Sequence, residues 1–158
     1  LEFGGRRIKR AIYIDLSSVC FCTPDMIEKF KKINYIKEYV ENKAKELDTY
    51  NKGISIEENL KINGRYMTNI GTFRAYIQQY LNHHPKLQKD IPAVVRQLPP
   101  GETGLPLEIY AYTNTSDWVE YENIQSDIFD HIISIADEFN LRLYQNPTGY
   151  DMRQITMR

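Results

Sequence analysis

The sequence predicts an α+β domain whose elements follow the order strand, helix, strand, strand, helix, strand. Apolar and polar residues alternate over residues 7–16 and again over 105–112, which is the period of a strand with one buried face. Over residues 23–52, 68–82 and 117–139, apolar residues recur at steps of three and four, as in amphipathic helices. Pro, Gly and Asn residues between these segments mark the turns.

The first strand is expected over residues 7–16, where only Arg10 interrupts the file of apolar residues. The first helix is expected to begin after Thr23, because a threonine is a good N-cap and Pro24 suits the first helical position. Gly53 marks its end. Its expected buried stripe is Ile27, Phe30, Ile33, Tyr39 or Val40, Ala44 and Leu47.

An insertion is expected at residues 54–91, before the second strand. It opens with apolar residues around an Asn-Gly dipeptide at 63–64, which favours a tight turn and predicts a small hairpin. A second helix follows, capped within residues 68–72, and ends at the His-His-Pro sequence of residues 83–85. Adjacent histidines do not share a helix face, so this pair is not expected to bind a metal ion.

Two further strands are expected to form a hairpin, over residues 93–98 and 105–112, joined by a loop that is rich in Pro and Gly. Alternation divides the residues of the later strand between two faces of the sheet. One face takes Leu105, Leu107, Ile109 and Ala111, and the other takes Glu108, Tyr110 and Tyr112.

Asp117, followed three residues later by Glu120, is a capping signature for the last helix, whose apolar stripe runs from Tyr121 to Phe139. Asn140 suits a left-handed stop, and residues 141–145 alternate as a fourth strand. The resulting β-α-β-β-α-β order is the split βαβ, ferredoxin-like arrangement, with the hairpin and helix inserted before the second strand. Helices are expected to cover one sheet face and to leave the other open.

The composition limits the classes of function. The chain has 158 residues, with 20 Lys and Arg against 21 Asp and Glu, so its net charge of −1 argues against a strong non-specific binder of nucleic acid. Its mean hydropathy is −0.53. No apolar run approaches the roughly 20 residues that a membrane-spanning helix requires. One domain is expected from this length.

No catalytic, cofactor-binding or metal-binding residue is expected. Cys20 and Cys22 are interpreted as reduced thiols, because two cysteines without a nearby histidine do not make a tetrahedral zinc site. Asp127 and His131 are interpreted as a polar pair on a helix face, four residues apart. The loop at residues 17–22 lacks the arginine that acylphosphatase-type enzymes with this strand order require. The chain is therefore not expected to be an enzyme.

The open sheet face is the candidate functional surface. Strand parity is expected to place on it Tyr13, Glu108, Tyr110, Tyr112 and Tyr144. Such an aromatic-rich face suits a contact with another subunit or domain. The alternative is a regulatory module that binds RNA or a small ligand on this face, as RNA-recognition-motif domains do. The missing basic-Gly-aromatic signature, the acidic Glu108 and the net charge speak against RNA.

Residues 63–76, NGRYMTNIGTFRAY, resemble the Asn-Gly-Arg-x-x-Thr-Asn-x-Gly-Thr-Phe-Arg-x-Tyr stretch of the small-conductance mechanosensitive channel (MscS) family, in its miniconductance, YbdG-like branch. Further similar stretches occur in the same order along nearly the whole chain. They are residues 4–10, 21–24, 95–98, 104–110 and 127–131.

The resemblance implies a homo-oligomeric channel, typically a heptamer. In such channels, membrane helices are followed by a β domain and an αβ domain, which together enclose a vestibule for ions and small solutes. It implies no cofactor, no catalytic residue and no nucleic-acid partner. The chain would then be a soluble part on the cytoplasmic face of the membrane. Residues 1–6 would be a cloning remnant and the end of the β domain, 7–146 the αβ domain and 147–158 a tail.

Overall fold

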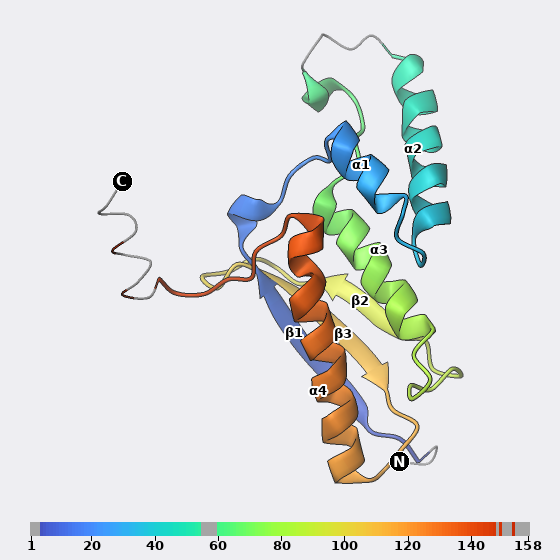
Figure 1. Ribbon diagram of the computed structural model, residues 1–158, viewed down its shortest axis with the longest axis vertical. Helices are drawn as coiled ribbons and strands as arrows, with labels where there is room; N and C mark the ends of the chain where they lie inside the picture. Colours follow the sequence, from blue (N-terminus) through green and yellow to red (C-terminus); the bar gives the residue numbers. More distant parts are fainter. Residues whose placement is uncertain (1–3, 55–59, 148, 150–152, 154–158) are drawn as a thin grey trace.

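A three-stranded antiparallel sheet with helices on one face forms the body of the computed structural model, which describes residues 4–54, 60–147, 149 and 153. The strands are β1 (Arg7–Ile14), β2 (Val94–Gln97) and β3 (Leu105–Tyr112), in the order β1-β3-β2. Helices α3 (Asn69–Asn82) and α4 (Trp118–Ile135) lie over one face of the sheet, and α1 (Pro24–Phe30) and α2 (Lys37–Lys52) extend beyond its end (Figure 1). The α+β class is confirmed.

The core lies between the sheet and the two covering helices. Ile12 of β1 pairs with Leu107 of β3, and both side chains are buried against the helices. Each fully buried side chain of this size contributes about 1.5–3 kcal/mol through the apolar surface that it removes from water. The helices supply Phe73, Ile77 and Leu81 from α3, and Ile124, Ile128 and Ile132 from α4.

Local capping signals decide where the helices begin and end. The Thr23 and Thr68 hydroxyls accept hydrogen bonds from Met26 N and Gly71 N at the starts of α1 and α3. Asp117 does the same for α4, through Glu120 N. After α4, the short 3₁₀ helix η3 (Ala136–Phe139) ends at Asn140, which has a φ of 57°. The predicted caps and the left-handed stop are confirmed.

The single helix predicted over residues 24–52 is wrong, because the chain turns between α1 and α2. Ile33 N donates to Phe30 O, and Ile36 N donates to Ile33 O, both at 3.1 Å. In a continuous helix, Phe30 and Ile36 would point about 120° apart around the helix axis. The turn instead buries both side chains, with Ile36 only 1% exposed.

The fourth strand predicted over residues 141–145 is also wrong, since its pairing with β1 is limited to the isolated bridge between Ile14 and Leu143. Asp15 N donates to Arg142 O, and Tyr144 N donates to Tyr13 O, each at 2.8 Å. The segment meets β1 only where that strand ends, so it has no partner for a longer ladder. The expected hairpin of residues 93–112 is present as β2 and β3.

The small hairpin expected around residues 63–64 is absent from the described part of residues 54–68, of which 55–59 lie outside the described residues. A 3₁₀ turn, η2 (Lys61–Asn63), stands there instead, and Gly64 N closes it on Lys61 O. The Asn-Gly dipeptide therefore ends a turn and does not join two strands. The expected tail, 147–158, lies mostly outside the described residues.

Candidate functional site

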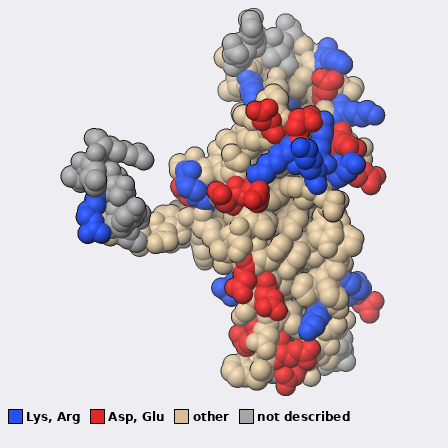
Figure 2. Space-filling model, in the orientation of Figure 1, with Lys and Arg blue, Asp and Glu red and all other residues tan. Residues whose placement is uncertain are grey.

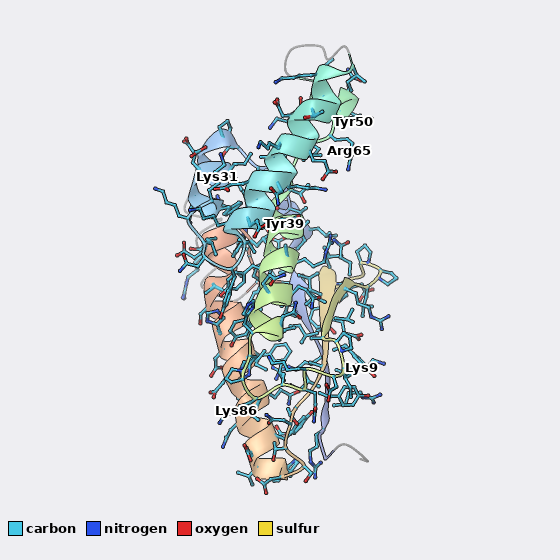
Figure 3. The ribbon with its side chains drawn as sticks, turned by 90° about the vertical axis from the view of Figure 1, so that its right-hand side faces the viewer. Lys9, Lys31, Tyr39, Tyr50, Arg65 and Lys86 are labelled. Atoms are coloured by element: carbon cyan, nitrogen blue, oxygen red, sulfur yellow. The ribbon has the colours of Figure 1, made fainter. Side chains whose placement is uncertain are left out.

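The open sheet face carries alternate residues of all three strands. Directly paired residues of an antiparallel sheet share a face, so Lys9 lies on the same side as its partner Tyr110. Lys9 points away from the helices (Figure 3). The face comprises Arg7, Lys9, Ala11 and Tyr13 of β1, Val94 and Arg96 of β2, and Pro106, Glu108, Tyr110 and Tyr112 of β3. No helix of the described chain covers it (Figure 3).

Two tyrosines and two cations form one end of this face. The hydroxyls of Tyr110 and Tyr112 lie 3.0 Å apart, and their rings meet edge to face at 5.7 Å. The Arg7 guanidinium lies 5.9 Å from the centre of the Tyr110 ring. The hydrogen bond with Tyr112, then Arg7 and Lys9, lower the pKa of Tyr110. This end combines aromatic area with positive charge, which suits an acidic partner surface.

An ion pair occupies the middle of the face. Arg96 donates from Nε and Nη2 to one oxygen of Glu108, at 3.0 and 2.8 Å. The Glu108 side chain is only 9% exposed, whereas that of Arg96 is 55% exposed. Arg96 therefore covers a carboxylate that the sequence alone placed simply on an exposed face.

The structure divides the predicted tyrosines between the two ends of the face. Tyr13 pairs with Pro106, six positions along β3 from Tyr112, which corresponds to about 20 Å. Tyr144 lies next to Tyr13, and its hydroxyl donates to Asn146 at 2.7 Å. The five predicted residues therefore form two tyrosine clusters on either side of Glu108.

A cluster of aromatic and histidine side chains, which the sequence analysis missed, joins α3 to α4. The Tyr76 hydroxyl and His131 Nε2 lie 2.6 Å apart, and the Tyr80 ring stacks on His131 at 4.4 Å. Tyr35 continues the cluster, 6.1 Å from the ring of Tyr76. The sequence interpreted His131 as one half of a polar pair with Asp127 on a helix face, whereas the hydrogen bond of its ring is with Tyr76 of α3. The contact with Tyr76 joins residues 55 positions apart, which spacing along one helix does not reveal.

Burial keeps this cluster uncharged at neutral pH. It lowers the pKa of His131 and raises the pKa values of Tyr76 and Tyr80. A neutral histidine bonded to a protonated tyrosine has no carboxylate to orient it and no nucleophile to activate within the described residues. The cluster therefore works as packing between two helices.

We expect replacement of His131 by glutamine to flatten the fall in melting temperature between about pH 7.5 and 5.5. The pKa of His131 is lower in the folded chain than the ordinary value of about 6.5, so the unfolded chain binds more protons as the pH falls through this window. The contribution of His131 to the free energy of unfolding is therefore highest above this window, and it falls as the pH decreases through the window. Thermal unfolding at several pH values checks the slope, and an unchanged slope in the variant would contradict this assignment.

The cysteine thiols and the acidic side chains of the described residues do not form a further catalytic or metal-binding site. Cys20 is exposed, Cys22 is buried, and neither forms a disulfide. Burial raises the pKa of Cys22 to about 11, so its nucleophilic thiolate form is scarce. Among the described residues, no three His, Cys, Asp or Glu side chains are grouped to hold a metal ion.

Charge is segregated although the net charge is small. Helix α4 carries four acidic residues and no Lys or Arg. Figure 2 shows mainly acidic side chains over its lower end, whereas over α1 and α2 it shows a dense group of basic side chains bordered by acidic ones. Local basic surfaces therefore exist that the net charge of −1 conceals.

A family model described as "Mechanosensitive ion channel MscS, C-terminal" matches residues 58–143, more than half of the chain. The chain belongs to the MscS family of mechanosensitive ion channels. The match covers α3, β2, β3, α4 and the bridge at Leu143. The resemblance seen in the sequence is thereby confirmed at the level of the family.

The matched part is the C-terminal, cytoplasmic domain of MscS channels, which are oligomeric channel proteins and not enzymes. Within the described residues, every helix is too short or too polar to traverse a lipid bilayer. The open face and the α3–α4 cluster are thus features of a channel's cytoplasmic domain.

Proposed function

We propose that the chain is the vestibule-forming cytoplasmic domain of a tension-gated, osmotically responsive channel of the miniconductance, YbdG-like branch. In this proposal, seven copies surround a chamber through which ions and small solutes reach the pore. The family match over residues 58–143 carries the proposal. The stretch at residues 63–76, which resembles the YbdG-like branch, supports the finer assignment.

The proposed division of the chain follows the elements. Residues 7–146 form the αβ domain, within which 54–91 is the insertion that contains α3. In this division, residues 1–6 precede the αβ domain and residues 147–158 follow it. The domain's role is structural: it shapes the vestibule and holds subunits together, and it performs no catalysis.

The open sheet face is the proposed contact with a neighbouring subunit or with the β domain. Tyrosines are favoured in protein interfaces because a large apolar ring carries one polar group. Tyr110 and Tyr112 provide such rings, and Arg7 beside them provides charge. The Tyr13 and Tyr144 end offers a second, smaller aromatic contact.

We expect Tyr112→Asp to weaken assembly of the full-length channel while it leaves the melting temperature of the 158-residue chain nearly unchanged. Tyr112 lies on a strand face that no described helix covers, so a carboxylate there is hydrated in the isolated chain and desolvated in a subunit contact. Size-exclusion chromatography with light scattering measures assembly. Tyr50→Asp, on exposed α2, is the control. Equal assembly in both variants would refute the contact.

We also expect the isolated chain to be a monomer or a weak oligomer at micromolar concentration. Without the pore helices and the β domain, the remaining contacts are expected to fall below the roughly 1,000 Å² of a stable interface. The full-length protein is expected to form a closed ring, since repeated head-to-tail contacts either close or polymerise. Light scattering on both proteins tests this, and a stable ring of the isolated chain would contradict it.

A further inference from the structure

A groove of about 370 Å³ lies between α2, the segment 64–68 and the first turns of α3. Tyr39 and Lys43 of α2 form one wall, and Gly71 and Arg74 of α3 form another. The groove lies on the part of the molecule that extends beyond the sheet, where Tyr39, Tyr50 and Arg65 are found along the length of α2 (Figure 3). It is separate from the open sheet face.

Positive charge converges on this groove. Lys43, Arg65 and Arg74 line it, and Lys61 approaches its aromatic wall, with Nζ 5.4 Å from the Tyr66 ring centre. The acidic side chain that contacts these cations within the described residues is Glu46, which lies 3.8 Å from both Lys43 Nζ and Arg65 Nη1. Among the described residues, four cations facing one carboxylate leave a local excess of three positive charges.

Arg74 is the least compensated of these cations. It is half-buried, and no ion pair or hydrogen bond of its side chain occurs within the described residues. It lies close enough to Tyr39 that its charge opposes the rise in the pKa of Tyr39 that burial causes. An arginine that is partly removed from water without an anionic partner is costly, and an anion in the groove would relieve that cost.

The backbone around the groove is fixed while the two arginine charges remain available. Asn51 bonds to both Arg65 N and Arg65 O at 2.9 Å, which anchors that residue to α2. Gly71, one turn before Arg74, lines the groove, and a Cβ added there would crowd the capping hydroxyl of Thr68 at 3.0 Å. Nearby, Thr68 caps α3, and Met67, Ile70 and Phe73 fill the core.

We propose that this groove binds a phosphate-bearing anion. Its phosphate groups would lie between Arg65, Arg74 and Lys43, and its organic part would pack on Tyr39 and Phe21. A carboxylate supplies one negative charge, whereas a phosphate monoester supplies about 1.5–2 and a diphosphate more, which fits an excess of three. The arginine fork also matches phosphate oxygens in pairs.

Two sources carry this chemistry: a soluble phosphorylated molecule and the headgroup of an anionic phospholipid. Anion binding in the groove does not depend on the proposed vestibule role, because it rests on the residues of this chain alone. It can therefore be tested on the 158-residue chain without a channel, and its failure leaves the channel assignment untouched.

Isothermal titration calorimetry of the chain with pyrophosphate tests the proposal. We expect saturable binding that weakens with added salt, and at least about tenfold weaker binding for Arg65→Gln and for Arg74→Gln, since each variant loses a charge-assisted hydrogen bond. Arg142→Gln, which removes an exposed arginine bound to Asp15, is the matched control and should bind like the parent. Arg74→Lys should recover part of the affinity.

Sedimentation with vesicles separates the two sources. A lipid headgroup is assigned if the chain binds phosphatidylglycerol vesicles but not phosphatidylcholine vesicles. This binding must also be abolished by Arg74→Gln and competed away by pyrophosphate. Pyrophosphate binding without vesicle binding would assign a soluble ligand. The proposal is overturned if neither probe binds saturably up to about 10 mM, or if Arg74→Gln and Arg142→Gln bind equally. Circular dichroism melting confirms that each variant is folded.

Discussion

Replacement of Asn69 by leucine is expected to lower the free energy of unfolding by about 3 kcal/mol or more. The Asn69 side chain is fully buried at the start of α3. Its Oδ1 accepts a hydrogen bond from Cys20 N at 2.9 Å, and its Nδ2 donates to Ser18 O at 2.9 Å and to Phe139 O at 3.1 Å. One amide thus ties α3 to the loop after β1 and to the end of η3.

Leucine has nearly the shape of asparagine but no polar atoms, so the variant leaves four backbone groups without this partner: Cys20 N and the carbonyl oxygens of Ser18, Phe139 and Asn140. For a chain of this length the loss corresponds to a fall in melting temperature of roughly 10 °C. Differential scanning calorimetry measures it, with Asn123→Leu on the exposed side of α4 as the control. A similar small change in both variants would show that Asn69 does not hold these segments together.

Gly104→Ala is expected to lower the free energy of unfolding by about 2–4 kcal/mol. Gly104 has a φ of +89°, a conformation that side chains other than glycine rarely adopt. An added Cβ would also overlap the backbone carbonyl oxygen of Ile14, at the end of β1. To accommodate the methyl group, the Gly104→Ala variant must either distort the turn between β2 and β3 or separate β1 from β3.

Gly101→Ala in the same turn is the control. Nothing lies within 4 Å of a Cβ added there, so the change is expected to stay within about 0.5 kcal/mol. Urea unfolding of the two variants gives the comparison. If the two substitutions cost the same, the close approach of Gly104 to β1 does not constrain the sequence.

Elements set by neighbours in the chain were predictable from the sequence. The caps Thr23, Thr68 and Asp117 act on backbone groups within three residues, so their positions alone identify three helix starts. Alternation likewise places Leu107 and Tyr110 on opposite faces of β3, as the structure confirms. These interactions are local, and a single sequence records them.

Features that depend on distant residues were not predictable. The turn that divides α1 from α2 exists because both Phe30 and Ile36 are buried, and helical periodicity does not show that requirement. The prediction of a fourth strand over residues 141–145 was wrong because the end of β1 limits how far this segment can pair, and alternation within the segment does not show that limit.

The candidate face shows the same division. Strand parity brought Glu108, Tyr110 and Tyr112 to one side, but the cover that Arg96 gives to Glu108 depends on how β2 and β3 pair. The sequence did not predict the basic groove, because Lys43 and Arg74 come from separate helices. The net charge of −1 also gives no sign of a local group of cations.

The central claim is that this chain is part of a tension-gated channel, and patch recordings of the full-length protein test it most directly. In excised patches, the full-length protein is expected to pass current as membrane tension rises, and deletion of residues 7–158 is expected to abolish assembly or current. A full-length protein that stays silent up to the lytic tension, or a truncated protein that gates normally, would contradict the account.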